Sequence, residues 1–340
     1  MKKHINIPIF IPHLGCPNNC VFCNQRSISG HLDFDRTSVE REIQEVLSTL
    51  KGDTYREIAF FGGSFTGIDG ELMIYLLEVA KRYIDAGDVQ GIRLSTRPDY
   101  ISAEILDILK AYGVTAVELG IQSMSQDVLD ASKRGHDTQI TERACALVKS
   151  YGFELVGQMM IGLPGADVES ECRTARRICE MGADFARVYP TVVFYETELC
   201  DMARCGEYMP LSDEEAVMRT KDVLRVFDSF GVPCIRVGLC ASENLSDENS
   251  VFGGANHSAI GELAMGEVYY EKICEELDKN PDLRGDELVI YGGIGTTSKI
   301  VGQNRRNKIR ICKKYGFNKL KILEKSEIIG YNIILDTFIR

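Results

Sequence analysis

The chain has 340 residues, of which 44% are hydrophobic and 26% are charged, a composition typical of a globular protein with a sizeable core. It contains no apolar run of about 18 residues, which excludes a membrane-spanning helix. The formal net charge of −11 argues against nucleic-acid binding by the surface as a whole.

The first segment, 1–11, carries two lysines but no apolar core followed by a cleavage site, and Pro8 interrupts it. We interpret it as a strand and not as a secretion signal, and we expect a cytoplasmic protein.

From the N-terminus to about Leu239, short β-rich runs alternate with amphipathic stretches of helical spacing. The predicted strands are 7–13, 57–61, 91–95, 116–120, 154–161, 185–193 and 234–237, and the predicted helices between them are 38–50, 71–86, 103–111, 139–151, 168–181 and 213–230. This alternation predicts an α/β fold of parallel strands with right-handed crossovers. We therefore expect a parallel (β/α) barrel, partial or full, over residues 1–240.

The pattern changes after Leu239. The polar, glycine-containing segment 240–255 predicts a loop, and helical spacing follows over 258–277. The tail predicts a strand at 287–291, a helix from Ser298, a second helix ending at Tyr315, and strands at 320–323 and 331–335. Residues 241–340 are thus expected to form a C-terminal extension, a helix plus a small α/β module.

Polar and glycine-rich segments follow the ends of six predicted strands: His13–Cys23, Gly62–Gly67, Ser95–Asp99, Gln122–Ser123, Gly162–Gly165 and Tyr189–Thr191. Parallel α/β folds bind ligands at the carboxyl ends of their strands. We expect these six loops to converge on one site.

The segment after the first strand carries Cys16, Cys20 and Cys23 in the spacing C-x3-C-x2-C. Three thiolates can hold three corners of a four-iron cluster, and the next cysteine along the chain is Cys145, so one iron would stay open. The alternative is a structural zinc site with His13 as the fourth ligand, although zinc sites usually combine two ligand pairs.

The nine other cysteines are scattered along the chain, and a cytosolic protein rarely forms disulfides. They are Cys145, Cys172, Cys179, Cys200, Cys205, Cys234, Cys240, Cys274 and Cys312. Those within helical patterns are best interpreted as small core residues.

With this cysteine motif after the first strand, the chain resembles the radical S-adenosylmethionine (SAM) superfamily. The resemblance implies a [4Fe-4S] cluster on Cys16, Cys20 and Cys23, SAM bound at the open iron, and reductive cleavage to a 5′-deoxyadenosyl radical. It also implies a flavodoxin or ferredoxin as the electron donor. Phe22 corresponds to an aromatic residue beside the SAM adenine, and its alternative role is that of a plain core residue.

The same resemblance implies further SAM contacts. The segment with Gly62, Gly63 and Ser64 is similar to the one that holds the SAM amino group in this superfamily. Because Ser64 stands where glutamate is common, the contact is expected to come from backbone carbonyls. The alternative is that this segment is a simple tight turn. Residues of the fourth strand, Glu118 and above all Gln122, would contact the ribose and amino groups, although a buried Glu118 can also belong to a structural ion pair.

Three more strand ends complete the expected site. Gly162 resembles the glycine under the adenine. Ser95 and Arg97 are expected at the mouth of the barrel, where Arg97 would clamp a carboxylate or form an ion pair. Strand alternation is expected to direct Arg187 and Tyr189 into the cavity, in contact with ribose or substrate.

Three strings narrow the resemblance: Glu118–Met124, Ser132–His136 and Val188–Thr191. Together they are similar to the radical SAM portion of the elongator catalytic-subunit family, which modifies wobble uridines of tRNA. Only about 100 residues follow Leu239, too few for that family's acetyltransferase domain. The chain therefore looks like the short bacterial form, whose substrates and use of acetyl-CoA the resemblance leaves open.

The tail is basic, with ten Lys and Arg residues over 299–325 against the single acid Glu324. Its order of strand, helix, loop, helix and strand, with Gly302 in the loop, resembles the KH module, whose G-x-x-G loop grips a nucleic-acid backbone. Here Arg305 replaces the second glycine. Residues 299–325 are thus a candidate contact for tRNA or another RNA, and a barrel cap with solvated basic residues is the alternative.

Three functional hypotheses follow. The first is radical modification of RNA, in particular tRNA. The second is radical modification of a small molecule, as in the related coproporphyrinogen dehydrogenases. The third is a non-enzymatic iron–sulfur carrier or RNA-binding adaptor.

Overall fold

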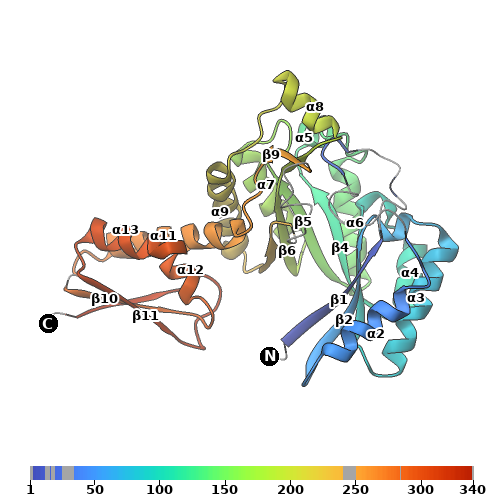
Figure 1. Ribbon diagram of the computed structural model, residues 1–340, viewed down its shortest axis with the longest axis horizontal. Helices are drawn as coiled ribbons and strands as arrows, with labels where there is room; N and C mark the ends of the chain where they lie inside the picture. The colour runs from blue at the N-terminus through green and yellow to red at the C-terminus, as the bar shows by residue number, and fades with distance from the viewer. Residues whose placement is uncertain are drawn as a thin grey trace.

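The computed structural model describes residues 3–11, 16, 20–24, 34–239, 250–283 and 285–338. Its larger unit is built on a curled sheet of seven parallel strands whose order in the sheet follows their order along the chain (Figure 1). The strands are β1 (Lys3–Ile11), β2 (Thr54–Gly62), β3 (Gly91–Thr96), β4 (Val114–Gln122), β5 (Glu154–Ile161), β6 (Phe185–Pro190) and β8 (Cys234–Val237). The predicted parallel (β/α) barrel is confirmed in its partial form, a curled half-barrel.

Helices connect successive strands and cover the outer side of the sheet (Figure 1). They are α2 (Val39–Thr49), α3 (Gly70–Asp85), α4 (Ala103–Ala111), α6 (Thr138–Ser150), α7 (Val168–Glu180) and α9 (Asp213–Ser229). Two short helices, α5 (Gln126–Ala131) and α8 (Glu198–Cys205), lie beyond the end of the sheet at the top of Figure 1. Several begin at a side-chain cap that their sequence supplies. Ser212 and Glu215, for example, form a reciprocal capping box at the start of α9.

The two faces of the sheet differ in chemistry because side chains alternate along each strand. On β4, Val117, Leu119 and Ile121 are buried against the helices in the main hydrophobic core. Glu118 and Gly120 lie on the opposite face, toward the inside of the half-barrel. The polar residues that the sequence places within strands therefore line the interior.

Two predicted segments were wrong in part. The strand expected over 185–193 leaves the sheet after Pro190, and Val192–Phe194 forms a separate strand, β7. β7 pairs antiparallel with β9 (Val251–Gly254), which falls inside the loop expected over 240–255. Neither segment has a periodicity of its own that reveals this pairing, because each strand is short and its partner is distant in sequence. Cys240 and the rest of 240–249 lie outside the described residues.

The C-terminal residues form a smaller unit with its own hydrophobic core, which includes Tyr269, Ile273, Ile290 and Ile311. Its elements are α11 (Ile260–Lys279), β10 (Glu287–Gly292), α12 (Thr297–Val301), α13 (Arg306–Tyr315), β11 (Lys319–Glu324) and β12 (Ile334–Phe338). β10 lies between β11, which is parallel to it, and β12, which is antiparallel. The last strand begins three residues later than predicted.

Ion pairs join this unit to the half-barrel. Glu271 of α11 accepts from Lys221 and Arg225 of α9, each at 2.6 Å, and Lys272 pairs with Asp228 at 2.5 Å. Figure 1 shows α11 extending from the half-barrel across the smaller sheet. In the part of the chain that the structure describes, no helix combines the length and the apolar character needed to cross a membrane.

We predict that Gly157→Ala destabilises the protein by about 1–3 kcal/mol, because overpacking a core has costs of this size. A Cβ at Gly157 on β5 would lie 2.4 Å from Cγ2 of Ile178, a stiff β-branched residue that is fully buried on α7. Urea unfolding measures the change. Gly253→Ala is the matched control, since no heavy atom lies within 4 Å of its Cβ position. Equal stability of the two variants would contradict the packing argument.

Candidate active site

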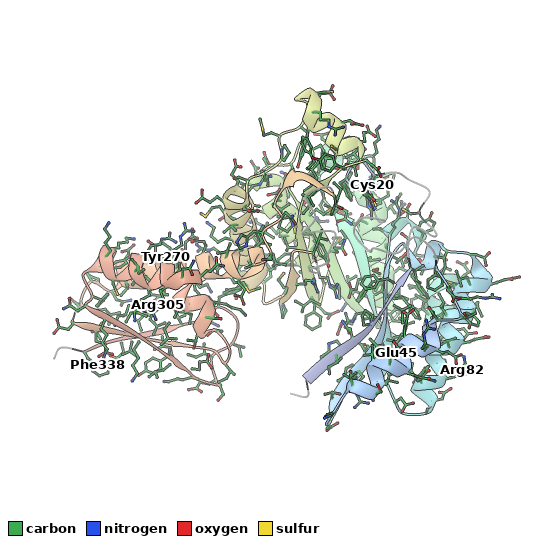
Figure 2. The ribbon with its side chains drawn as sticks, viewed as in Figure 1. Cys20, Glu45, Arg82, Tyr270, Arg305 and Phe338 are labelled. Carbon is green, nitrogen blue, oxygen red and sulfur yellow. The ribbon has the colours of Figure 1, made fainter. Side chains whose placement is uncertain are left out.

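The loop after β1 carries the three clustered cysteines, and two backbone hydrogen bonds hold it from outside. The amide of Val21 donates to the carbonyl of Ser132 at 3.2 Å, and the carbonyl of Val21 accepts from the amide of Leu199 at 2.8 Å. Within the loop, the amide of Cys23 donates to the carbonyl of Cys20 at 2.9 Å, which forms a turn. Figure 2 shows Cys20 beyond the carboxyl end of the sheet, where the predicted site lies.

Two buried guanidinium groups lie beside these sulfur atoms. Nη1 of Arg134 donates to Sγ of Cys20 at 3.5 Å, and its Nη2 donates to the carbonyl of Gly120 at 2.7 Å. Arg97 forms a bidentate pair with Asp99, both distances 2.9 Å, and donates to the carbonyl of Arg134 at 2.6 Å. Arg134 therefore ties the cysteine loop directly to the end of β4, and Arg97, which follows β3, holds Arg134 in place.

Neighbouring groups keep the buried Arg97 in its charged form. Burial alone would lower the pKa of this guanidinium, but the hydrogen bond and charge of Asp99, together with Cys16 and Cys20, raise the pKa. The predicted alternative of an ion pair for Arg97 is thus present, with Arg97 buried and Asp99 open to solvent. Nη1 of Arg97 is buried without a partner among the described residues, so this residue keeps a donor for a ligand.

The segment at the end of β2 lies against the start of the cysteine loop. The amide of Gly63 donates to the carbonyl of Ile11 at 2.7 Å. Gly62 has a φ of +103°, and a Cβ there would lie 2.7 Å from the same carbonyl oxygen. Glycine at position 62 is therefore required by the close approach of β1, while Ser64 is buried in the turn that follows.

The end of β4 contains the most unusual backbone of the site. Gln122 adopts a φ of +67°, and its Oε1 is buried without a hydrogen bond among the described residues. A Cβ at Gly120 would lie 2.9 Å from Nη2 of Arg134 and 3.0 Å from Nε2 of Gln122. Left-handed backbone at a glutamine is uncommon and typical of functional sites.

Inside the half-barrel, Glu118 lies between two arginines. Arg187 of β6 approaches Oε1 of Glu118 at 3.0 Å and Arg93 of β3 approaches it at 3.5 Å. Burial raises the pKa of the Glu118 carboxyl, although Arg187 and Arg93 oppose the shift. Oε2 of Glu118 has no partner among the described residues. The structure thus places Glu118 in the ion-pair network that was its alternative role, with one oxygen to spare.

Arg187 and Tyr189 lie together on the interior face of β6. Nη1 of Arg187 donates to the hydroxyl of Tyr189 at 3.4 Å, and its guanidinium lies 5.0 Å from the ring centroid of Phe61. Ser95 faces Glu118 across the β3–β4 pair. These interior residues therefore form one surface, as strand alternation predicts.

The loop after β5 is held by a second buried ion pair. The amide of Gly162 donates to Oε1 of Glu171 at 2.7 Å, and Arg219 of α9 pairs with the same carboxylate at 2.6 Å. The hydroxyl of Tyr208 donates to the carbonyl of Gly162 at 2.7 Å. Gly162 has a φ of +80°, and its position is fixed from both sides.

Phe22 is partly buried in a small cluster with Val193, Leu199 and Tyr208 above the half-barrel. This packing agrees with the alternative role of Phe22 as a plain core residue. Phe22 lies between the second and third cysteines in the sequence.

Among residues 3–11, 16, 20–24 and the other described ranges, no three His, Cys, Asp or Glu side chains form a group that could hold a metal ion. His13, the fourth ligand of the zinc alternative, lies outside the described residues.

Comparison with known families decides the class of the protein. Residues 10–178 match the family model of the radical SAM superfamily, and residues 183–270 match the radical SAM C-terminal domain. The chain belongs to the radical SAM superfamily. Members of this superfamily use a [4Fe-4S] cluster and SAM, and the chain is an enzyme of this class.

Individual relatives refine the radical SAM comparison. An uncharacterised protein of Methanocaldococcus jannaschii is 28% identical over 235 residues, 66% of this chain and 72% of that protein. The tRNA uridine(34) acetyltransferase of the same organism is 30% identical over 181 residues, 47% of this chain and 34% of that enzyme. Elongator complex protein 3 of Saccharomyces cerevisiae is 33% identical over 125 residues, 36% of this chain and 22% of that protein. The chain thus spans about a third or less of the length of these two named relatives.

Solved structures agree on the radical SAM fold. Archaeal Elp3 from Methanocaldococcus infernus superposes with a TM-score of 0.62 at 21% identity, covering 84% of this chain and 64% of the other. Methylornithine synthase gives a TM-score of 0.50 at 17% identity, covering 75% of this chain and 76% of the other.

Two residues of the site were not identified from the sequence, Arg134 and Asp99. Both lie in segments already noted, 132–136 and 95–99. What was missing is the contact of Arg134 with Cys20, 114 residues away in the sequence, and the pairing of Asp99 with the buried Arg97.

We predict that His136→Gln flattens the loss of stability in mild acid. Burial, and then the charge of Arg134, lower the pKa of His136 to about 4. In the unfolded chain its pKa is about 6.5, so the folded state disfavours the proton, and stability is lost as the pH falls from about 6.5 toward 4. Between about pH 7.5 and about pH 5 the wild type should lose about 2 kcal/mol more than the variant.

Urea unfolding at the two pH values measures this difference. Between about pH 7.5 and about pH 9 histidine is neutral in both states, so the two proteins should there change in parallel. Parallel loss in the acidic range would show that His136 is not responsible.

Proposed function

We propose that Cys16, Cys20 and Cys23 hold the cluster of this radical SAM enzyme and leave one iron for the amino and carboxylate groups of SAM. When bound, the cluster would supply the electron for reductive cleavage of SAM to methionine and a 5′-deoxyadenosyl radical. The observation that carries the assignment is the hydrogen bond from Arg134 to Sγ of Cys20, with Arg97 beside it. A cation that donates to a thiolate sulfur stabilises the negative charge of a cysteine-bound cluster.

The unpartnered buried atoms around the cysteine loop support a SAM site on the same face. Oε1 of Gln122 and Oε2 of Glu118 are acceptors, and Nη1 of Arg97 is a donor. The ammonium group of SAM would donate to such acceptors, and its carboxylate would accept from the Arg97 donor. The close-packed turn at Gly62 and Gly63 offers backbone carbonyls near the same loop, while Gly162 lines the opposite edge. Phe22 would shield the ligand from water. Arg187, Tyr189 and Ser95 would contact the ribose or the substrate.

The proposed substrate is RNA, in particular tRNA. The support is the similarity to a tRNA uridine(34) acetyltransferase and to Elongator complex protein 3. The proposal covers radical chemistry on a nucleoside and not acetyl transfer, because the matched segment is 34% of that acetyltransferase. Flavodoxin or ferredoxin is the proposed electron donor.

Cys20→Ala should abolish both cluster absorbance and SAM cleavage, because two thiolates cannot hold the cluster with its open iron. The protein is reconstituted anaerobically with iron and sulfide, and 5′-deoxyadenosine is quantified after addition of SAM and a reductant. Cys172→Ser is the matched control, since Cys172 lies half-buried on α7 outside the site. Retained cleavage in Cys20→Ala, or bound zinc in place of iron, would overturn the ligand assignment.

RNA as substrate predicts a separate outcome. Adding total tRNA to the reconstituted wild type should raise 5′-deoxyadenosine formation above its uncoupled rate and produce a nucleoside of new mass after digestion. A small-metabolite extract serves as the parallel arm. If that extract raises 5′-deoxyadenosine formation and the tRNA stays unmodified, the RNA hypothesis is overturned in favour of a small-molecule substrate. The radical SAM assignment would stand in either case.

A further inference from the structure

The smaller C-terminal unit has an arrangement that the radical chemistry does not use. Two adjacent parallel strands, β10 and β11, are joined through α12 and α13, and these helices meet at the turn Gly302–Arg305. Neither family match extends beyond residue 270. The role of this unit must therefore be argued from its own residues.

The turn between the helices is tightly fixed. Gly302, Asn304 and Arg305 all have positive φ values, of 75°, 52° and 61°. The amide of Arg305 donates to the carbonyl of Gly302 at 3.0 Å, and a Cβ at Gly302 would lie 2.9 Å from Cγ of Asn307. Asn307 itself is buried and donates to the carbonyl of Gly266 on α11 at 2.8 Å. The turn is thereby anchored to the body of the unit.

This rigid turn presents polar side chains outward, since Gln303 to Arg306 are all exposed. Arg305 occupies the position of the second glycine of a KH loop, and it adopts the left-handed backbone that glycine would favour. The turn thus keeps a left-handed residue at this position while a cation is added. A preorganised loop loses little entropy when it binds a ligand.

Basic residues gather around the turn, and acids accompany some of them: Glu214, Glu215 and Glu267 line one pocket with Arg306. Arg310 and Arg306 share Glu267, and Lys314 and Lys319 each have a carboxylate within 3.7 Å. The six other basic residues of the segment form no ion pair among the described residues: Lys299, Arg305, Lys308, Lys313, Lys321 and Lys325. Helix α13 begins with Arg306 and has no acidic residue in its first turn, although helix N-termini favour negative charge.

An apolar side chain is left uncovered beside these cations. Ile309 is 60% exposed on α13, at helical spacing from Arg306 and Lys313. Lys321 and Leu323 of the edge strand β11 point away from Leu320 and Ile322, which pack in the core under the helices, and so lie on the other face of the sheet. A surface that alternates cations with exposed apolar groups matches a chain that alternates phosphates with bases.

We propose that the turn Gly302–Arg305, with the basic face of α13, binds the backbone of single-stranded RNA. In this arrangement Arg305 and the neighbouring lysines of α13 neutralise phosphates, and Ile309 contacts a base. Single-stranded RNA fits better than an anionic membrane or an acidic protein, because the cations surround a turn of KH geometry and not a flat face. The inference goes beyond the proposed reaction, since this surface lies outside the half-barrel.

Fluorescence anisotropy of the full-length holoprotein with a labelled single-stranded RNA oligonucleotide tests the inference. SAM and reductant are omitted, so the result does not depend on whether RNA is the substrate. Arg305→Gly is the decisive variant, because glycine keeps the turn and removes only the side chain. We expect its affinity to fall by about 3-fold to 10-fold and the slope of log affinity against log salt to decrease by about 0.7.

A matched control and competitors complete the test. Lys51→Glu changes an exposed cation on the half-barrel and should alter RNA affinity by less than about 2-fold. Arg305→Glu/Lys313→Glu should weaken binding more than Arg305→Gly. Unchanged affinity in both Arg305 variants would overturn the inference, as would an equal loss in Lys51→Glu. Competition by duplex RNA or anionic vesicles as strong as by single-stranded RNA would also overturn it.

Discussion

The candidate site depends on the guanidinium of Arg134. One nitrogen donates to Sγ of Cys20 and another to the backbone of β4, while the carbonyl of the same residue accepts from Arg97. Burying two cations next to each other is costly unless each has good partners. Asp99 and the backbone carbonyls supply most of these partners, so the arrangement is stable only when the cysteine loop and the ends of β3 and β4 are assembled together.

The interior of the half-barrel follows the same rule. Arg93 links Glu57, Glu118 and Glu154, which belong to three different strands, and Arg187 adds β6 to this network. An apolar interior would avoid the free-energy cost of burying charges but would offer no partner to a charged ligand. In this network most charged side chains pair with one another, and single atoms such as Oε2 of Glu118 have no hydrogen-bond partner among the described residues. Polar strand residues thus combine structural support with capacity for binding.

Most of the fold was predictable because it follows from local periodicity. β5 and β8 occur at the predicted bounds, and the main helices agree to within one or two residues. The pairing of β7 with β9 and the short helices α5 and α8 were missed, since such brief segments acquire their structure from distant partners. The site shows the same limit. A lone acid in an apolar strand indicated that Glu118 is paired, but its partners emerge only from the register that sets Ser95 beside Glu118 and Gln158 beside Arg187.

Helix α9 connects the two parts of the molecule mechanically. Through Arg219 it holds Glu171 and the Gly162 loop at the rim of the site, and through Lys221 and Arg225 it holds Glu271 of α11. One helical turn before Glu271 on α11, Glu267 holds Arg310 of α13, beside the Gly302 turn. Arg306, which follows the turn, lines one pocket with Glu215 and Met218 of α9. The proposed RNA-binding turn therefore lies against the same helix that holds the Gly162 loop, so RNA bound at the turn would also lie beside the half-barrel.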